Sequence, residues 1–283
     1  MRTRSFDNEN DGILYLVATP IGNLDDITYR AIEILKSVDK IYAEDTRNSL
    51  VLLKHYNITT HLESYHEFNQ ELKTSTIIQE IIDGKKIALI SDAGLPVISD
   101  PGFKIVKEAR LKGLKISTIP GASAGISALI ASGISPMPYT FYGFLDSKKT
   151  KRISELNELK YINHTIIFYE APHRIYETLE DIKEVFGDRQ IVLARELTKT
   201  FEEYIQGRIS EILKIDSLKG EMVLIVEGYK EEAIESFDPM KKIDELISLG
   251  YKPNEAIKEI AKQLNTSRND LYKQYSDYKL KKE

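Results

Sequence analysis

Short apolar runs that end at turns alternate with helical patterns along most of this chain. The first run, ILYLVA at 13–18, precedes a helical pattern over 27–37, similar runs follow at 41–43 and 87–90, and a further strand pattern at 115–119 ends at Pro120. Continuous apolar runs indicate strands buried on both faces, and strands that alternate with helices indicate a mostly parallel sheet. The sequence therefore predicts an α/β domain over residues 13–121.

The same alternation resumes after a proline-containing stretch at 133–138. A helical pattern covers 174–186, and strand patterns stand at 139–144, 165–169, 190–194 and 222–226. These segments predict a second α/β domain over residues 122–230. The predicted fold class is thus two α/β domains followed by a small helical extension.

The two ends of the chain depart from this pattern. Residues 1–12 lack the apolar stretch of a secretory signal, so we expect a flexible lead-in. Residues 231–240 are acidic and weakly patterned and are predicted to form a linker. Residues 241–283 hold ten Lys and Arg against seven Asp and Glu, a local charge of +3. Their apolar spacing predicts a small helical domain, with a groove-reading helix–turn–helix as the alternative.

Composition excludes several classes of protein. Of the 283 residues 42% are hydrophobic, which excludes disorder over the whole chain. The absence of cysteine excludes disulfides, thiolate-bound metals and a catalytic thiol, and it fits a reducing cytoplasm. No apolar run approaches the roughly 18 residues that span a bilayer. We therefore expect a cytoplasmic protein without a metal site or a membrane contact.

Three loops at predicted strand ends are rich in glycine, proline and small residues: 19–23, 91–102 and 120–125. Ligands of open α/β sheets bind beyond the carboxyl ends of the strands, and glycine lets the backbone approach a ligand closely. The loops therefore predict a ligand-binding crevice. They contain neither a phosphate-binding P-loop nor the G-x-G-x-x-G of dinucleotide sites, and the chain has no G-x-S-x-G of serine hydrolases.

Six segments carry a resemblance to a known family: LYLVATPIGNLDDIT (14–28), AEDTR (43–47), SDAGLPVISDPG (91–102), IPGASA (119–124), FYEAPHR (168–174) and GEMVLIVEG (220–228). Together they resemble the ribosomal RNA small subunit methyltransferase I family. That family belongs to the tetrapyrrole methylase-like enzymes that use S-adenosylmethionine. The resemblance implies two α/β domains with the cofactor, S-adenosylmethionine, in the cleft between them.

The resemblance also implies which residues bind the cofactor. Pro20 and Ile21 of the first loop would approach it, and the Asp92 carboxylate would accept hydrogen bonds from its ribose or amino group. Backbone N–H groups at Ser123 and Ala124 would bind an anionic part at a helix N-terminus. The remaining cofactor-binding predictions are Ala93, Gly94, Pro96, Tyr169 and Ala194. The segment 100–102 is interpreted as a helix start and not as a contact.

Further residues are implied for catalysis and for RNA binding. A ribose 2′-hydroxyl is a poor nucleophile until its proton is removed, and Glu170 and His173 are the candidate general bases. Helix capping and surface charge are the alternative interpretation of His173 and Arg174. Basic side chains would bind RNA phosphates, and the predicted set is Arg47, Lys148, Lys149, Lys151, Arg152 and Arg174.

The resemblance thus implies 2′-O-methylation of a cytidine in small-subunit (16S) ribosomal RNA by a homodimer. Two alternatives stay open. One is a small-molecule, tetrapyrrole-like methyltransferase of the same superfamily, and the other is a ribosome-binding factor without catalysis. The basic segment 148–152 and the extension 241–283 favour RNA, because a small substrate needs neither.

Overall fold

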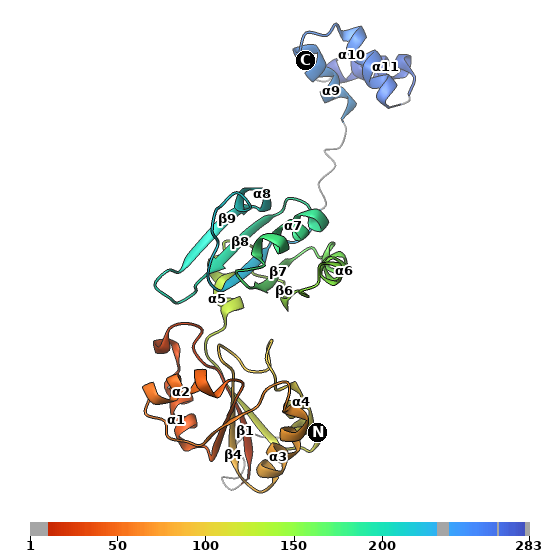
Figure 1. The fold of residues 1–283 in the computed structure, drawn as a ribbon. Coiled ribbons are helices and arrows are strands. Elements are labelled where there is room, and N and C mark those ends of the chain that lie inside the picture. Colours follow the sequence, from red (N-terminus) through yellow and green to blue (C-terminus); the bar gives the residue numbers. More distant parts are fainter. Residues whose placement is uncertain (1–10, 231–237, 265, 281–283) are drawn as a thin grey trace. The chain divides into compact units, whose positions relative to one another are not determined.

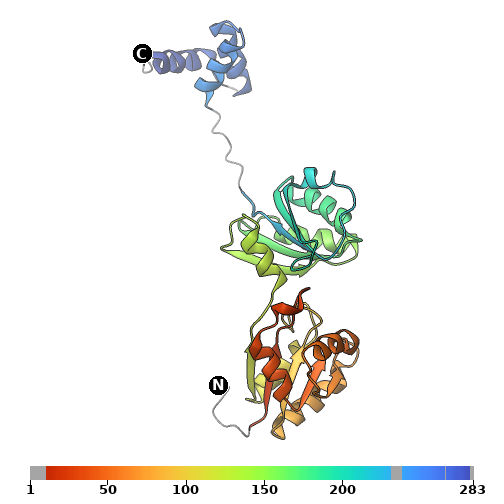
Figure 2. The same ribbon diagram turned by 90° about the vertical axis from the view of Figure 1, so that its left-hand side faces the viewer.

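The computed structural model describes residues 11–230, 238–264 and 266–280. The chain divides into two compact units, residues 1–229 and 230–283. The first unit contains two five-stranded sheets with helices packed on them, and the second contains only helices (Figures 1 and 2). The predicted fold class, two α/β domains with a helical extension, is confirmed.

The first sheet is parallel throughout, as predicted, with the strand order β3-β2-β4-β1-β5. β1 lies between β4 and β5, and the register of the three strands places Val17 opposite both Ile90 and Ile119. The three loops that follow these strands therefore leave the sheet at one edge. The strands are β1 Ile13–Val17, β2 Lys40–Ala43, β3 Leu62–Ser64, β4 Lys86–Ile90 and β5 Lys115–Ile119.

Helices cover both faces of the first sheet (Figure 1). One apolar cluster packs α1 and α2 on one face, and a second packs α3 and α4 on the other. β3 and α2 were not predicted, because α2 begins in the charged run at 44–47 and carries no long apolar stripe at its start. Asp45 caps α2 by accepting a hydrogen bond from Arg47 N at 2.8 Å. The helices are η1 Leu24–Asp26, α1 Tyr29–Ser37, α2 Thr46–His55, α3 Gln70–Ile82 and α4 Phe103–Leu111.

The second sheet has the order β6-β7-β10-β8-β9, and it is mostly antiparallel. Only β6 and β7 pair in parallel, so the expectation of a mostly parallel arrangement is wrong for this half. β8 and β9 are joined by a short loop without a crossover helix, and neighbouring strands joined in this way must run antiparallel. β10 also runs antiparallel to both of its neighbours, β7 and β8. The strands are β6 Tyr139–Phe144, β7 Thr165–Glu170, β8 Gln190–Arg195, β9 Glu203–Arg208 and β10 Met222–Val226.

Two apolar clusters also cover the second sheet. The larger includes Leu156 of α6 and Leu179 of α7, and the smaller includes Ala128 and Leu129 of α5. α6 was not predicted, because its first turn is the basic segment that sequence analysis assigned to RNA binding. The helices are α5 Ala124–Ala131, α6 Lys149–Leu159, α7 Ile175–Phe186 and α8 Ile209–Ile212.

The second unit packs three helices around its own small core, which includes Ile243, Ile257 and Leu271. They are α9 Pro239–Ser248, α10 Pro253–Gln263 and α11 Arg268–Leu280. Most of the predicted linker, 231–237, and most of the predicted lead-in, 1–10, lie outside the described residues. The linker was predicted to extend to residue 240, but Asp238 already caps α9. No helix in the described ranges is long and apolar enough to span a membrane.

Candidate functional site

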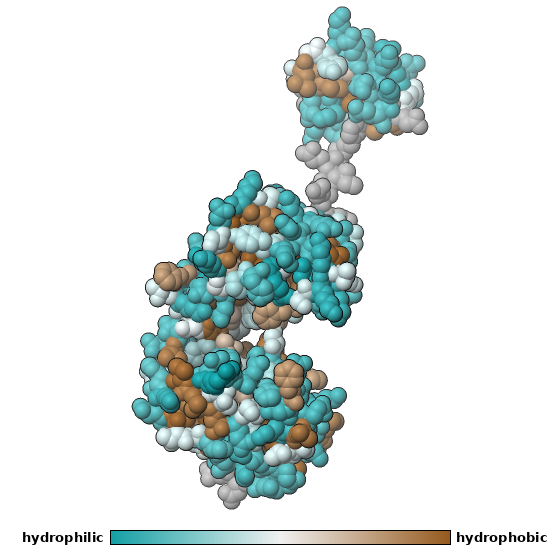
Figure 3. Space-filling model, viewed as in Figure 1, coloured by the Kyte–Doolittle hydropathy of each residue, from teal (hydrophilic) through white to brown (hydrophobic). Residues whose placement is uncertain are grey.

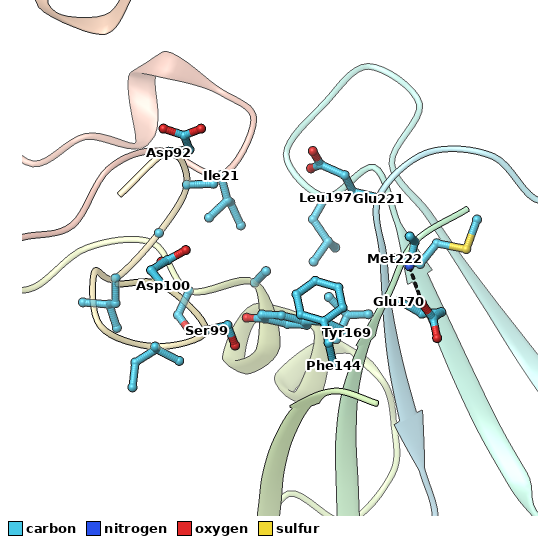
Figure 4. A pocket seen from close by; sticks show the side chains of 18 of the residues that line it. Ile21, Asp92, Ser99, Asp100, Phe144, Tyr169, Glu170, Leu197, Glu221 and Met222 are labelled. Atoms are coloured by element: carbon cyan, nitrogen blue, oxygen red, sulfur yellow. Dashed lines mark hydrogen bonds between the residues drawn. The ribbon is translucent and has the colours of Figure 1, made fainter. Parts of the chain in front are cut away.

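A cavity of about 360 Å³ lies between loops of the first sheet and the β6, β7 and β10 region of the second. Figure 4 shows Ile21, Asp92 and Asp100 on one side of it and Leu197, Glu221 and Met222 on the other. Both sides belong to the first compact unit. The volume falls in the range of small-molecule and cofactor sites. All three predicted loops contribute lining residues, which agrees with the predicted crevice.

The loops after β1 and β4 are joined by backbone hydrogen bonds. Thr19 N donates to Gly94 O at 2.9 Å, and Gly94 N donates to Thr19 O at 3.1 Å. The Thr19 hydroxyl also donates to Ser91 O at 3.1 Å. Gly94 has a φ of +77°, which strains any side-chain-bearing residue. These two backbone hydrogen bonds hold the loops together and fix the backbone that forms one wall of the cavity.

Ile21 joins the two halves of the unit. It follows β1 in the chain, yet it packs in the apolar cluster formed by α5 and by Ala194 and Val223 of the second sheet. It is buried and also lines the cavity. The first loop therefore closes one end of the cavity as an apolar wall.

Aromatic rings form the part of the cavity that belongs to β6 and β7. The Tyr169 ring lies edge-on to Phe141 and to Phe144, with ring centroids 5.0 and 5.5 Å apart. The Tyr169 hydroxyl accepts a hydrogen bond from Gly125 N, in the first turn of α5, at 3.1 Å. Ser123 caps α5 without a side-chain hydrogen bond to the helix. Its hydroxyl and the N–H of Ala124 are therefore available to a ligand, whereas the N–H of Gly125 is bonded to Tyr169.

The charged side chains that line the cavity are all acidic, but two of them have basic partners: Glu170 bonds to Arg174, and Glu221 lies 3.2 Å from Lys199. The lining includes four carboxyl groups, those of Asp92, Asp100, Glu170 and Glu221, and no Lys, Arg or His among the described residues. Among the described residues, Asp92 and Asp100 are the lining carboxyl groups that form no ion pair, so the negative charge available to a ligand is theirs. A ligand with a positive charge is favoured, because opposite charges attract most strongly where water is partly excluded.

Asp92 also ties the cavity to α2. Its Oδ2 accepts a hydrogen bond from Asn48 Nδ2 at 2.8 Å, and its Oδ1 accepts one from Asp45 N at 3.3 Å. Both donors belong to the start of α2. Each carboxylate oxygen can accept a second bond, so Asp92 can hold α2 and a ligand hydroxyl together.

The carboxyl group of Asp100 lies near that of Glu44, which follows β2. Partial burial and then the neighbouring charge of Glu44 raise the pKa of Asp100 to about 7, although a hydrogen bond from Ser91 opposes the shift. Burial and the charge of Asp92 also raise the pKa of Glu44. The segment 100–102 leads into α4 Phe103–Leu111, as predicted, but Asp100 also lines the cavity, which was not expected.

Seven of the ten predicted cofactor-binding residues line the cavity: Ile21, Asp92, Ala93, Gly94, Ser123, Ala124 and Tyr169. Pro20, Pro96 and Ala194 do not. Pro20 and Pro96 are buried behind the loops, and Ala194 lies in the core of the second sheet. Sequence reasoning missed Asp100, Phe144 and Leu197. For Asp100 the signal was available, because it lies in the loop 91–102 that the prediction already contained.

The two candidate bases lie in different surroundings. Glu170 is buried, and both of its oxygens have partners. Oε1 accepts from Ala171 N and from Arg174 Nη2, each at 2.7 Å, and Oε2 accepts from the Thr178 hydroxyl at 2.6 Å. This is the geometry of a structural carboxylate and not of a free base. His173 is exposed and does not line the cavity, although its neighbour Pro172 does.

Some of the predicted RNA-binding side chains are exposed, and others are held in ion pairs within the protein. Lys148, Lys149 and Lys151 are exposed around the first turn of α6, and Arg47 is exposed although it pairs with Asp45. Arg174 is bound to Glu170. The prediction for Arg152 is wrong, because its side chain is 1% exposed and pairs with Asp181 in the interior. A buried guanidinium cannot reach an RNA phosphate.

Comparison with known proteins identifies the family. Residues 13–213 match the model of the Tetrapyrrole (Corrin/Porphyrin) Methylases. Ribosomal RNA small subunit methyltransferase I of Bacillus subtilis (strain 168) is 48% identical, over 97% of this chain and 98% of its own length. The chain belongs to the ribosomal RNA small subunit methyltransferase I family. The family member of Pasteurella multocida (strain Pm70) is 43% identical over 94% of this chain and 97% of its own length.

Solved structures confirm the fold of the first unit. A diphthine synthase has a TM-score of 0.60 at 16% identity, over 76% of this chain and 89% of its own. The uroporphyrin-III-C-methyltransferase of Thermus thermophilus has a TM-score of 0.55 at 18% identity, over 76% and 94%. At such identities the likeness shows a shared fold and leaves the substrate open.

Proposed function

We propose that this chain uses S-adenosylmethionine to methylate the 2′-hydroxyl of a cytidine in small-subunit ribosomal RNA. The names of its relatives support a ribosomal RNA substrate. The observation that carries the cofactor assignment is the lining of the cavity, where Asp92 and Asp100 form no ion pair and, among the described residues, no basic side chain takes part. S-adenosylmethionine carries a positive charge on its sulfur, and nucleotide cofactors carry phosphates. A ribosomal substrate would place the protein in the cytoplasm.

The residues present fit each part of S-adenosylmethionine. Ile21, Leu197 and Val223 offer an apolar surface for the adenine ring. Asp92 can accept hydrogen bonds from ribose hydroxyls. The first turn of α5, with the uncommitted Ser123 hydroxyl, suits the carboxylate of the amino acid part. The faces of Tyr169 and Phe144 suit a sulfonium, because aromatic rings attract cations.

When bound, S-adenosylmethionine supplies a methyl group on a positively charged sulfur. The protein's own contribution is to hold and orient the reactants. The hydrogen bonds between the loops at Thr19 and Gly94 and the packing of Ile21 hold one wall of the cavity in place. Fixing two reactants in line removes much of the entropic barrier to their reaction.

Binding of the RNA is assigned to exposed lysines. Lys148, Lys149 and Lys151 begin α6, directly after β6, whose Phe144 lines the cavity. The net charge of the chain is -5, so a local basic patch must supply the attraction to phosphates. We therefore propose an assembled ribosomal subunit as the substrate and expect the reaction to weaken strongly with salt.

The test is nucleoside mass spectrometry of small-subunit RNA from cells with and without the gene. We expect loss of 2′-O-methylcytidine in the deletion strain and its return when small subunits from that strain react with purified protein and S-adenosylmethionine. An unchanged nucleoside profile would refute the ribosomal assignment. Failure of the purified protein to bind S-adenosylmethionine by calorimetry would refute the cofactor assignment separately.

A matched pair of variants connects the reaction to the cavity. Phe144→Leu keeps apolar bulk at the cavity and removes the π face, and Phe144 is 52% exposed, so the fold should tolerate the change. We expect S-adenosylmethionine affinity to fall about 3- to 10-fold, the size of one cation–π contact. Tyr161→Leu, at an exposed position away from the cavity, is the control.

We also propose that the chain forms a homodimer. Apolar side chains gather over α1 and α2 on the face shown in Figure 3, and Val51 of α2 is 64% exposed. An exposed apolar patch of this kind is typical of an interaction surface. Light scattering during gel filtration should give twice the 32.3 kDa of one chain, and a mass of one chain would contradict the proposal.

A further inference from the structure

Two large apolar side chains that line the cavity are also half exposed to solvent. Ile98, in the loop after β4, is 50% exposed, and Phe144, at the end of β6, is 52% exposed. Side chains that line a cavity and also face solvent lie at its mouth. We call these two residues the rim pair. Exposed apolar surface at such a place is typical of a surface that a second ligand covers.

The loop after β4 is strained where it presents Ile98. Val97 and Ser99, on either side of Ile98, have φ angles of +79° and +63°, in the left-handed region. This conformation is unfavourable above all for a β-branched residue such as Val97. Val97 packs inward on the apolar cluster of α3 and α4, and a Cβ atom at Gly102 would lie only 2.9 Å from its Cγ2. The inward packing of Val97 therefore fixes the backbone turn that leaves Ile98 at the mouth of the cavity.

A bulge in β6 presents Phe144. The register of β6 against β7 shifts between Phe141 and Gly143, and Gly143 has a φ of +87°. In a regular strand, side chains three residues apart point to opposite faces of the sheet. Phe141 and Phe144 nevertheless both lie edge-on to the Tyr169 ring. The bulge therefore turns Phe144 toward the cavity, and re-aiming a side chain is a known role of bulges beside binding sites.

The strained loop and the bulge meet each other. A Cβ atom at Gly143 would lie 3.1 Å from the hydroxyl oxygen of Ser99, so a side chain there would press on Ser99. Figure 4 shows Ser99, Phe144 and Tyr169 around the same part of the cavity. Ile98 is next to Ser99 in the chain, and Phe144 is next to Gly143. This contact therefore brings the rim pair together at one mouth, and backbone strain of this kind is concentrated at functional sites.

We propose that the rim pair holds the base of the acceptor nucleotide, turned out of the ribosomal RNA, while the 2′-hydroxyl of that nucleotide enters the cavity. This inference rests on the proposed function, because it takes the methyl donor to lie in the cavity. The acceptor oxygen must approach the methyl group through the mouth, so the base on the same ribose lies against the rim. Aromatic and apolar side chains are the usual contacts of an unstacked base.

The distribution of charge favours the same orientation of the nucleotide. Among the described residues, no basic side chain lines the cavity, so a phosphate is favoured outside it. Lys148 is exposed and follows Phe144 by four residues, which limits the separation of their backbones to about 14 Å. A nucleotide with its base on the rim pair and its phosphate near Lys148 would direct its ribose toward the cavity.

Kinetics with small subunits from the deletion strain test the proposal. Ile98 is the residue to change, because Phe144 is also proposed to face the sulfonium. At saturating S-adenosylmethionine, we expect Ile98→Ala to raise the KM for the subunits about 5- to 20-fold, in the lower part of the range for one base contact. The affinity for S-adenosylmethionine, measured by calorimetry, should stay at the wild-type value. Ile98→Leu keeps the apolar surface and should restore a KM close to that of the wild type.

Ile82→Ala is the matched control for these kinetics. Ile82 is also 50% exposed and does not line the cavity. We expect this variant to have the KM of the wild type. Thermal unfolding should show that both alanine variants are folded at the assay temperature.

A photocrosslink identifies what the rim pair touches. Benzoylphenylalanine in place of Ile98 should crosslink to the cytidine whose 2′-O-methylation is lost in the deletion strain. The same group in place of Ile130, which is exposed on α5 and does not line the cavity, is the control and should not crosslink to it. Crosslinks from position 98 only to ribosomal proteins, or only to nucleotides elsewhere in the RNA, would overturn the proposal.

The kinetics also separate this proposal from the proposed function. If the wild-type protein does not methylate small subunits, both proposals fall. If it does and Ile98→Ala has the same KM as Ile82→Ala, only the role of the rim pair falls. If Ile98→Ala weakens S-adenosylmethionine binding as much as it raises the KM, Ile98 belongs to the cofactor site and the proposal is overturned.

Discussion

Replacing Arg152 with alanine is expected to lower the free energy of unfolding by about 3 to 5 kcal/mol, the usual cost of breaking a buried ion pair. Its Nε and Nη2 both lie 2.7 Å from Asp181 Oδ2. Nη1 donates to Ser147 O at 3.1 Å and to Asp146 O at 3.4 Å. The variant would leave the buried Asp181 carboxylate with only the exposed Lys149 as a charged partner, at 3.1 Å.

Denaturant unfolding followed by circular dichroism measures this effect. Lys148→Ala is the matched control, because it removes a charge from the same basic segment at an exposed position. We expect the control to change stability by less than about 0.5 kcal/mol and to weaken RNA binding. The interior assignment of Arg152 would be contradicted if its variant were as stable as the control and showed only an RNA-binding defect.

Arg152 also shows why a charge pattern alone mispredicts a residue. Four bases in the six residues from Ser147 to Arg152 favour a solvated segment. The structure places Arg152 and Leu156 of α6 on the side that packs against α7, one helical turn apart. The partner, Asp181, is 29 residues further along the chain. Local sequence contains no signal for such a contact, because it exists only after α6 and α7 pack together.

Most strands of the parallel sheet could be predicted, although β3 was missed. β1 and β4 are apolar runs with turns at their ends, and β5, which reads KISTI and precedes Pro120, was predicted with its observed bounds, Lys115–Ile119. The polar strands were harder. β9 reads EYIQGR, which is partly exposed along its length and carries no strong alternation. The antiparallel order of the second sheet follows from tertiary pairing with β10, which no local pattern encodes.

The site could be predicted at the level of loops but not of every side chain. Parallel strands bring their carboxyl ends to one edge, so the loops after β1, β4 and β5 had to meet. Asp100 was assigned to a helix start, and that assignment did not anticipate its place in the cavity lining. This place depends on the bend of the loop 91–102, which only the folded backbone shows.

The second large effect is expected at Glu170. Glu170→Gln should lower the free energy of unfolding by about 1.5 to 3 kcal/mol, because it weakens a charge-assisted bond to Arg174 and disturbs two further bonds in a buried site. The Arg174 guanidinium would lose its carboxylate partner at the start of α7. Thermal and denaturant unfolding of the purified variant measure the loss.

The same variant decides between the two roles considered for Glu170. A general base typically contributes about 10²- to 10⁴-fold to the rate, so its loss would show in kcat at a temperature where the variant is fully folded. The three hydrogen bonds on the carboxylate indicate a structural role, so we expect kcat to fall less than about tenfold at that temperature, well short of the loss that a general base would show. Thr178→Val, which removes only the bond to Oε2, is the matched control and should reproduce part of the stability loss. A hundredfold loss of kcat in a variant of wild-type stability would restore Glu170 as the base.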